Sequence, residues 1–327
     1  MTKTKNIYVT GGSGFIGSNI CRELLKKKYN VHCIDIVDTY RVKDLKKNKN
    51  FFFYKVSILN TNNLKKIIKK NSYIYHFAAI ADPLKYVQEP LNTLNIDLKA
   101  SINIFEIAQK KNCKIIFAST SEVYGKNPKV PWSEDDDRVL GSTKINRWCY
   151  SSSKAVSEHY LIAYAKEKKL KFVIFRFFNV YGPGLDSLGN GRVLTMMLEG
   201  FLNNKDVLIH GNGKQTRSFS YIDDVVNGVV EVSHNKKCEN DIYNIGSNKE
   251  IKIIDLAKKI KKLGNFSSKL KFIDHRKVFG KSYEDVPRRV PSLKKINKFL
   301  KYNKKTSLNE GLKKIISWHK DINIKKS

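Results

Sequence analysis

The chain of 327 residues has no long apolar run, no paired cysteine motif and few histidines. An apolar stretch such as residues 172–178 is short and contains Arg176, whereas a membrane-spanning helix needs about 18 apolar residues or more. The five cysteines are odd in number and lack CxxC spacing, which predicts buried thiols in a reducing compartment. Isolated histidines such as His76, His159 and His210 offer no metal site.

The start of the chain also favours a cytoplasmic protein, in agreement with the reducing compartment that the cysteines predict. Residues 1–5 lead directly into a strand-like run at residues 6–10, which leaves no room for a cleavable signal. We therefore predict a cytoplasmic protein that does not engage a membrane.

Acidic residues are scarce, with 30 Asp and Glu against 62 Lys and Arg and a net charge of +32. Such an excess raises the possibility of nucleic-acid binding, because clustered cations neutralise phosphates. Here the lysines are spread along the whole chain, without an aromatic-interleaved basic motif or zinc-ligand spacing. We therefore expect no nucleic-acid partner, although a basic surface favours an anionic substrate.

Short β-branched runs alternate with helical patterns in the first half of the chain, which predicts a parallel sheet wrapped by helices. The predicted strands are residues 6–10, 31–35, 51–56, 73–77, 114–118 and 171–175. The predicted helices lie near residues 14–28, 61–70, 95–111 and 150–168. The fold class is α/β, a Rossmann-like doubly wound parallel sheet with a smaller α/β substrate-binding lobe.

The second half is less regular, with a Gly182-Pro183-Gly184 turn, a loop at residues 211–217 and helical patterns at residues 253–263 and 308–320. We predict a Rossmann domain at residues 1–178 and a second lobe at residues 179–327, with some of its segments returning to the first domain. Such a lobe closes over the carboxyl ends of the strands, where open α/β sheets bind ligands.

A glycine-rich segment, residues 10–17, follows the first predicted strand and opens the first predicted helix. In that context the glycines allow a tight turn, and the helix N-terminus receives a pyrophosphate. Asp35 ends the second strand, where a carboxylate accepts hydrogen bonds from the adenosine ribose and repels a 2′-phosphate. The pattern predicts NAD as the cofactor, although the nearby Arg41 favours NADP.

Tyr150 and Lys154 are four residues apart, so they lie on one face of their helix. A phenol has a pKa near 10 in water, too high for a base at neutral pH. A neighbouring ammonium and a positively charged nicotinamide both favour the phenolate, which then accepts a proton from a substrate hydroxyl.

Several further motifs occur in a consistent order along the chain. They are the glycine-rich loop, His76-Phe-Ala-Ala79, Asn95, Thr120-Ser121-Glu122-Val-Tyr-Gly125, Tyr150/Lys154, Arg176-Phe-Phe-Asn179-Val-Tyr-Gly-Pro183 and Gln215-Thr-Arg217-Ser-Phe-Ser-Tyr221-Ile-Asp223. Together they resemble the extended short-chain dehydrogenase/reductase family, and specifically its NAD-dependent nucleotide-sugar epimerases, dehydratases and decarboxylases.

The resemblance implies a role for each matching position. Thr120 hydrogen-bonds the sugar 4-hydroxyl, Tyr150 is the base, and Lys154 holds the nicotinamide ribose; Ser121 and Glu122 complete the catalytic set. The cofactor-binding set is Gly11, Gly14, Phe15, Ile16, Gly17, Asp35, Ser57, Ala78, Asn95, Tyr150 and Lys154. The residues implied to bind the diphosphate, the nucleoside or the sugar are Asn179, Arg192, Arg217 and Arg289.

Two positions depart from the family pattern. Ser57 stands where relatives usually carry an Asp that contacts adenine, which predicts weaker cofactor binding. Ser292 likewise replaces an Asp in the segment Arg288-Arg289-Val-Pro-Ser292, which puts one contact with the substrate nucleotide in doubt.

The resemblance leaves three reactions open, all beginning with oxidation of the sugar at C4. We place a UDP-sugar 4-epimerase of the UDP-glucose or UDP-uronate type narrowly first. A UDP-glucuronate decarboxylase is the alternative, because Ser121-Glu122 with Arg289 resembles those enzymes, as does the segment Arg147-Trp-Cys-Tyr150. A 4,6-dehydratase ranks third, because Ser121-Glu122 replaces the usual Asp-Glu pair. A non-catalytic NAD-binding regulator is expected to lose Thr120, Tyr150 or Lys154, and all three are present.

The helical segments 95–111 and 150–168 carry more apolar residues than one buried stripe requires. The residues concerned are Ile102, Ile104, Phe105, Ile107, Tyr160, Leu161, Ile162 and Tyr164. One face must cover the sheet, and the other is free to form a four-helix bundle with a second copy. Relatives commonly dimerise in this way, so we predict a homodimer.

Overall fold

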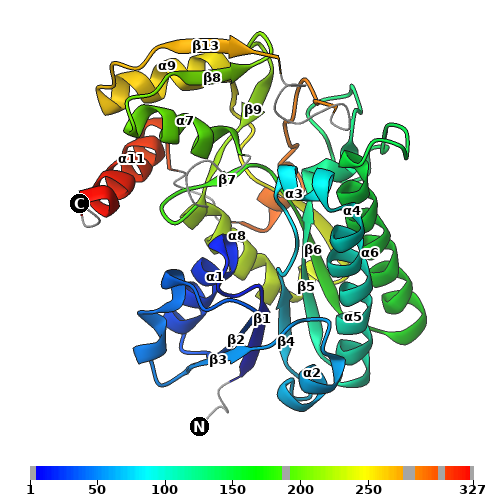
Figure 1. Ribbon diagram of the computed structural model, residues 1–327. Coiled ribbons are helices and arrows are strands. Elements are labelled where there is room, and N and C mark those ends of the chain that lie inside the picture. The colour runs from blue at the N-terminus through cyan, green and yellow to red at the C-terminus, as the bar shows by residue number, and fades with distance from the viewer. Residues whose placement is uncertain (1–4, 186–191, 275–283, 301–305, 325–327) are drawn as a thin grey trace.

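A single parallel sheet of seven strands forms the larger part of the fold, in the order β11-β6-β5-β4-β1-β2-β3 (Figure 1). The computed structural model describes residues 5–185, 192–274, 284–300 and 306–324. The strands are β1 (Asn6–Thr10), β2 (Asn30–Asp35), β3 (Phe51–Lys55), β4 (Tyr73–His76), β5 (Lys114–Thr120), β6 (Phe172–Phe177) and β11 (Asp241–Ile245). All six neighbouring pairs are parallel, which confirms the predicted Rossmann-like doubly wound fold.

Helices cover both faces of this sheet, so its strands are buried on both sides. Within β1, Ile7 and Val9 face α1 (Phe15–Lys26) and α8 (Ile222–His234), while Tyr8 faces the opposite side. That side is covered by α2 (Thr61–Ile67), α5 (Ala100–Lys110) and α6 (Arg147–Lys168), as Figure 1 shows.

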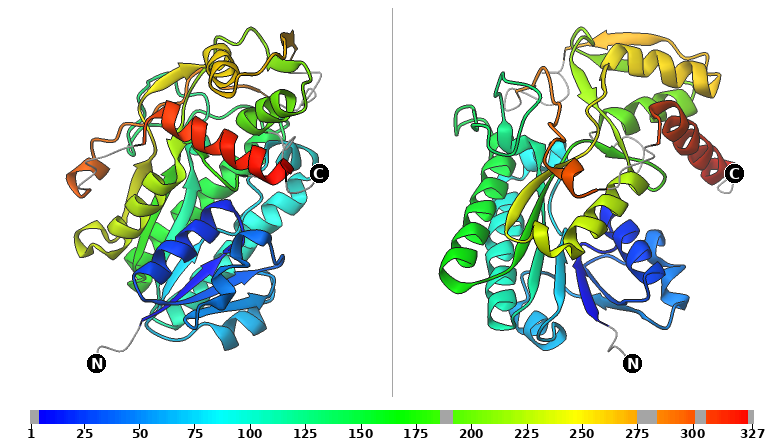
Figure 2. Two further views of the ribbon diagram at one scale, coloured as in Figure 1. Left: turned by 90° about the vertical axis from the view of Figure 1, so that its left-hand side faces the viewer. Right: turned by 180° about the vertical axis from the view of Figure 1, so that it is seen from behind.

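The second lobe sits above the carboxyl ends of the strands in every view (Figure 2). It contains α7 (Val193–Leu202), β8 (Val207–His210), β9 (Thr216–Ser218), β12 (Glu250–Lys252), α9 (Ile253–Gly264), β13 (Leu270–Ile273) and α11 (Leu308–Ile324). Two short sheets form there, β12 with β9 and β13 with β8, and the pair β7 (Val180–Tyr181) and β10 (Ser220–Tyr221) leads into it.

The chain crosses between the two parts more than once. After β10 it returns through α8 to β11, which pairs with β6 in the main sheet, and then it re-enters the lobe. The predicted domain boundary at residue 178 therefore remains a proposal, and it describes only the first passage of the chain from the sheet to the lobe. Residues 222–245 lie after that boundary but belong to the sheet side of the molecule.

Two helical segments near the carboxyl edge differ from their predicted bounds. The segment predicted as one helix over residues 95–111 begins with a π-helical turn, η3 (Asn95–Lys99), preceded by α3 (Pro83–Gln88) and α4 (Pro90–Leu94). Helix α6 begins at Arg147, three residues before the predicted start, so Tyr150 lies in its first turn and Lys154 in its second. Short 3-10 turns complete the structure: η1 (Tyr40–Val42), η2 (Leu45–Lys47), η4 (Ser121–Tyr124), η5 (Lys236–Cys238) and η6 (Ile296–Lys298).

All five cysteines are free thiols; four are buried and Cys149 is partly exposed. Across the described ranges, we find no helix with the length and apolar character that crossing a membrane requires.

Candidate active site

A cavity of about 570 Å³ lies between the carboxyl edge of the sheet and the second lobe. Its sheet-side wall comes from the glycine-rich loop, the loop after β4, the end of β5 and the first turns of α6. Its lobe-side wall comes from α7, β8, β9 and the loop before η6. This is the position at which open parallel sheets bind ligands.

The glycine-rich loop requires glycine at two positions for different steric reasons. Gly11 has φ +68°, and a Cβ there would lie 2.6 Å from the backbone nitrogen of Ala78. A Cβ on Gly17 would lie 2.1 Å from the carbonyl oxygen of Gly11, so glycine lets α1 pack against the loop. Gly11, Gly14, Phe15, Ile16 and Gly17 all line the cavity, as predicted.

The N-terminus of α1 presents donors toward this cavity. Its N-cap, Gly14, has no side chain to bond the first-turn N–H groups, which also have no intrahelical partner. An anionic diphosphate satisfies both these donors and the positive end of the helix dipole.

Asp35 is held by the backbone of the same loop. Its Oδ2 accepts a hydrogen bond from the Ser13 N–H at 3.0 Å, and its Oδ1 accepts one from the Val37 N–H at 3.2 Å. Arg41, which favoured NADP in the sequence, instead donates through Nε to the Gly184 carbonyl at 2.7 Å. The carboxylate is thus fixed at the strand end, and the competing cation is engaged elsewhere.

The other residues of the predicted cofactor set do not line the cavity. Ala78 packs its backbone against Gly11, and Ser57 Oγ accepts a hydrogen bond from the Leu59 N–H at 3.2 Å. Asn95 begins the π-helical turn and is only partly buried. The fully buried polar side chain of that turn is Asp97, two residues further on.

The five predicted catalytic residues do lie together on the cavity wall: Thr120, Ser121, Glu122, Tyr150 and Lys154. Tyr150 is 7% exposed and stacks in parallel on Tyr86, with ring centroids 5.1 Å apart. Lys154 Nζ lies 6.0 Å from the centroid of the Tyr150 ring, which confirms that the two side chains share one helix face. Thr120, at the end of β5, accepts a hydrogen bond from the Glu122 N–H and so caps η4.

The surroundings of Tyr150 act on its pKa in opposite directions. Burial raises the pKa of Tyr150, and the negative charges of Asp97 and Glu122 raise it further. Arg192 and a hydrogen bond with Thr120 lower that pKa, but they do not offset the burial. The expectation that the Lys154 ammonium and a positively charged nicotinamide together favour the phenolate stays a prediction for the cofactor-bound protein.

Lys154 is the clearest sign that the site accommodates a cofactor. It is 1% exposed, and its Nζ has no hydrogen-bond partner among the described residues. A buried ammonium without a hydrogen bond is costly, and ribose hydroxyls would supply acceptors. Together with the glycine-rich loop and Asp35, this donor fits a dinucleotide such as NAD.

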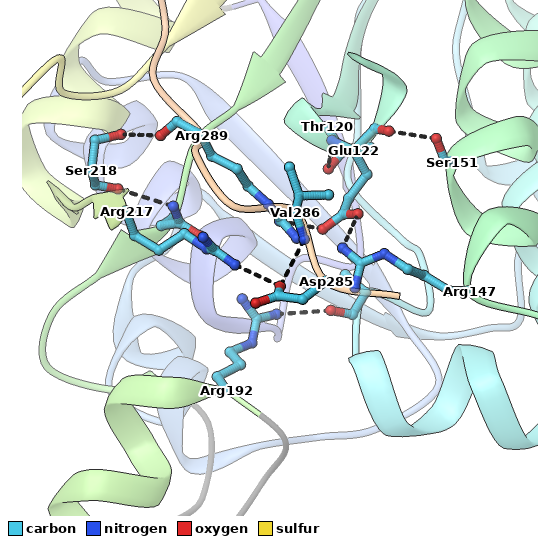
Figure 3. A network of polar contacts seen from close by, with 12 residues as sticks. Thr120, Glu122, Arg147, Ser151, Arg192, Arg217, Ser218, Asp285, Val286 and Arg289 are labelled. Atoms are coloured by element: carbon cyan, nitrogen blue, oxygen red, sulfur yellow. Dashed lines mark hydrogen bonds and ion pairs between the residues drawn. The ribbon is translucent and has the colours of Figure 1, made fainter. Parts of the chain in front are cut away.

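Glu122 anchors a network of charges on the wall of the cavity (Figure 3). One carboxylate oxygen binds Arg147 at 2.7 Å, and the other pairs with Arg289 from the second lobe. Burial raises the pKa of Glu122, but Arg147 and Arg289 outweigh it and lower that pKa to about 2. Glu122 is therefore a carboxylate at neutral pH and cannot act there as a general acid.

The predicted substrate-binding residues all line the cavity as well. Arg217 pairs with Asp285 at 2.7 Å, and Arg192 donates to the Ala81 carbonyl at 3.3 Å (Figure 3). Asn179 donates to the Ser218 carbonyl at 3.0 Å, close to the backbone that carries Arg289. Four arginines face two carboxylates here, so the network leaves an excess of positive charge suited to an anionic ligand.

Asp97 and Asp285 escaped the sequence analysis, and Arg147 was noted there only within the segment Arg147-Trp-Cys-Tyr150, which resembles that of the decarboxylases, without a role of its own. Arg147 lies just before the Tyr150/Lys154 pair, and Asp285 lies just before the segment Arg288–Ser292. A search of the residues beside each motif for an opposite charge would have found both. Asp97 carried no signal in the sequence; in the structure it lies in the π-helical turn, and its backbone carbonyl accepts a hydrogen bond from Ser157 of α6.

The comparisons with known proteins agree with this geometry. A family model described as the NAD dependent epimerase/dehydratase family matches residues 7–246. The UDP-N-acetyl-alpha-D-glucosaminuronate decarboxylase of Bacillus cytotoxicus is 34% identical over 97% of this chain and 98% of its own length.

Two solved structures share the whole fold. The UDP-glucose 4-epimerase of Thermotoga maritima with UDP-glucose is 30% identical, with a TM-score of 0.86 over 97% of this chain and 99% of the other. The UDP-glucuronic acid 4-epimerase of Bacillus cereus, in complex with UDP-glucuronic acid and NAD, is 27% identical, with a TM-score of 0.85 over the same shares of the two chains.

Proposed function

This chain belongs to the NAD-dependent epimerase/dehydratase family, and we propose that it decarboxylates a UDP-linked uronic acid through a 4-keto intermediate. The family's members include both NAD-dependent nucleotide-sugar epimerases and decarboxylases. The proposal selects decarboxylation, where the sequence alone had placed 4-epimerisation narrowly first.

The observation that carries this choice is the Arg289–Glu122–Arg147 cluster beside Thr120 and Tyr150. A guanidinium has five donors, so Arg289 retains donors for a substrate carboxylate while it is paired with Glu122. The near full-length similarity to a uronate decarboxylase supports the same choice.

The first step concerns the proton of the sugar 4-hydroxyl. In this mechanism Thr120 orients the hydroxyl, and Tyr150 Oη accepts its proton. NAD, when bound, supplies the hydride acceptor for C4. Lys154 holds the cofactor ribose, and its positive charge opposes reprotonation of the buried phenolate.

The second step is the loss of the carboxylate. A ketone at C4 makes the C6 carboxylate part of a β-keto acid, whose C5–C6 bond breaks to release CO2. The bonding electrons enter the C4 carbonyl, where the Tyr150 proton stabilises the enolate oxygen; a solvent proton at C5 then restores the ketone. Return of the hydride to C4, with the Tyr150 proton going to the C4 oxygen, would restore the hydroxyl, the base and the oxidised cofactor. Arg289 orients the substrate carboxylate, and its ion pair with the anionic Glu122 holds Arg289 in place. The negative charge of Glu122 also repels the substrate carboxylate from positions other than the one beside Arg289.

Proton and carbon-13 NMR of the purified protein with NAD test the proposal. UDP-glucuronate, UDP-N-acetylglucosaminuronate and UDP-glucose are supplied separately, with carbon-13 at C6 in the uronates. We expect labelled CO2 and bicarbonate, together with the anomeric signal of a five-carbon sugar, from a uronate only. Retention of the label in every product would refute decarboxylation.

A 4-epimerase is the second candidate, because both solved relatives described above are 4-epimerases. It predicts a slow approach to a mixture of two sugars with every carbon retained. Glu122→Gln separates the two chemistries: it should slow decarboxylation by about 10²-fold or more, because Arg289 loses the carboxylate that positions it, and epimerisation much less. Glu239→Gln, a carboxylate remote from the cavity, is the matched control and should leave either rate unchanged.

A further inference from the structure

A buried carboxylate lies behind the catalytic wall. Asp97 is fully buried in the π-helical turn η3, an irregularity that occurs frequently at functional sites. Its Oδ1 accepts a hydrogen bond from the Ile80 N–H at 2.8 Å, while its Oδ2 has no hydrogen-bond partner among the described residues. A buried carboxylate oxygen without a bond is costly, so this side chain requires an explanation.

The backbone of Asp97 is tied to the catalytic helix. Its carbonyl oxygen accepts hydrogen bonds from Ser101 Oγ at 2.7 Å and from Ser157 Oγ at 3.3 Å. Ser157 lies on α6, one turn beyond Lys154, so η3 is fixed against the face of α6 that carries Lys154.

The other ionisable groups around Lys154 are already committed. Glu158 makes two bonds to Arg176, at 3.0 and 2.7 Å, and also accepts from Ser119. The two nitrogens of His76 contact Thr10 Oγ1 at 2.7 Å and Ser101 Oγ at 2.9 Å, and burial lowers the pKa of His76 to about 3, so this ring is neutral.

We propose that Asp97 is the buried counter-ion of Lys154, a positioning residue that keeps the ammonium charged and fixed beside Tyr150. The electrostatics agree in both directions. Burial lowers the pKa of Lys154, and Asp97 is the largest of the groups that raise it. Burial raises the pKa of Asp97 to about 6, and Lys154 is the largest of the groups that lower it.

Asp97 also acts on Tyr150, whose pKa its charge raises. The charged and titratable groups that act on Asp97, Lys154 or Tyr150 are His76 on β4, Cys149 and Glu158 on α6, and Glu122 and Arg192 across the cavity; Arg176 on β6 is paired with Glu158. Removing the Asp97 charge alone therefore lowers the pKa of Lys154 and that of Tyr150 together.

Asp97→Asn tests this inference, because the amide keeps the shape and an acceptor for the Ile80 N–H. We expect both limbs of the pH profile of kcat/KM to move to lower pH by about one unit or more. Glu134→Gln is the matched control: Glu134 is buried and accepts the Asn244 N–H at 2.8 Å, but it does not line the cavity. Its profile should overlay the wild type. An unshifted profile in folded Asp97→Asn overturns the inference.

A second measurement needs neither substrate nor a folded Asp97 variant. Carbon-13 NMR of labelled aspartate carboxyls follows the titration of Asp97 in the wild type and in Lys154→Gln. By linkage, loss of the ammonium should raise the pKa of Asp97 by about one unit, and an unchanged value overturns the inference. The inference depends on the proposed function only in taking Tyr150 as the base, so this titration succeeds or fails independently of the reaction.

Discussion

The charge state of Glu122 shows how single residues set the chemistry of this cavity. A carboxyl beside two guanidinium groups accepts hydrogen bonds and stays ionised, whatever general-acid role its position in a motif permits. Its folded-state pKa of about 2 lies below the ordinary value of 4.5, so the native state binds this proton more weakly than the unfolded chain.

A pH dependence of stability follows from that depression. The contribution of Glu122 is fully present above about pH 4.5 and is lost as pH falls toward 2. The difference corresponds to roughly 3 kcal/mol of unfolding free energy. Urea unfolding of the wild type and Glu122→Gln should therefore differ by about that amount at pH 7, and the gap should narrow steadily below pH 4.5. A gap independent of pH would show that Glu122 acts through packing alone.

Tyr150 supplies the second prediction at this scale. Tyr150→Phe removes only the phenolic oxygen and keeps the ring stacked on Tyr86. Turnover should fall by about 10²-fold to 10⁴-fold, because the proton of the 4-hydroxyl loses its acceptor. The Kd for NAD, measured by calorimetry, should stay within about twofold of the wild type. Comparable turnover in the variant would contradict the assignment of the base.

At the scale of elements, the alternation of apolar runs and helical patterns predicted every strand of the first half of the chain and the helices α1, α2, α5 and α6, but not α3 and α4. The other differences occur at the ends of elements. Helix α6 starts at Arg147 because tertiary contacts recruit residues before the predicted start, including the pairing of Arg147 with Glu122. The π-helical turn η3 was not predictable, because one inserted residue per turn leaves the pattern of apolar residues almost unchanged.

The packing of the glycine-rich loop against α1 gives a prediction for that element. Gly17→Ala places a Cβ 2.1 Å from the Gly11 carbonyl oxygen, so helix and loop must separate. We expect a loss of about 2 kcal/mol of unfolding free energy and at least tenfold weaker NAD binding. Gly14→Ala is the graded control, because its Cβ would meet the same oxygen at 3.2 Å and requires a much smaller shift. Equal stability in the two variants would refute this packing argument.

At the scale of the whole molecule, the order of motifs predicted which residues converge on one cavity, but not how they pair. The sequence places Glu122 and Arg289 far apart, and only the closure of the second lobe brings their charges together. The return of the chain through α8 to β11 is a matter of topology, which local patterns do not encode. Long-range pairing is therefore the part of the site that required the structure.

The remaining prediction is that the protein is a homodimer formed through residues 95–111 and 150–168, which lie in η3, α5 and α6. Of the apolar residues behind this expectation, Ile104, Phe105, Ile107 and Leu161 face the sheet, while Tyr160 is 40% and Ile162 44% exposed. Val156 and Leu91 extend the exposed apolar surface over α6 and α4, which contact each other. Burial of this surface stabilises a dimer, so light scattering should give twice the mass of one chain. Tyr160→Glu should yield monomers, whereas Phe272→Glu, at a similarly exposed site on β13, should not. A wild-type mass near that of one chain would contradict the prediction of a homodimer.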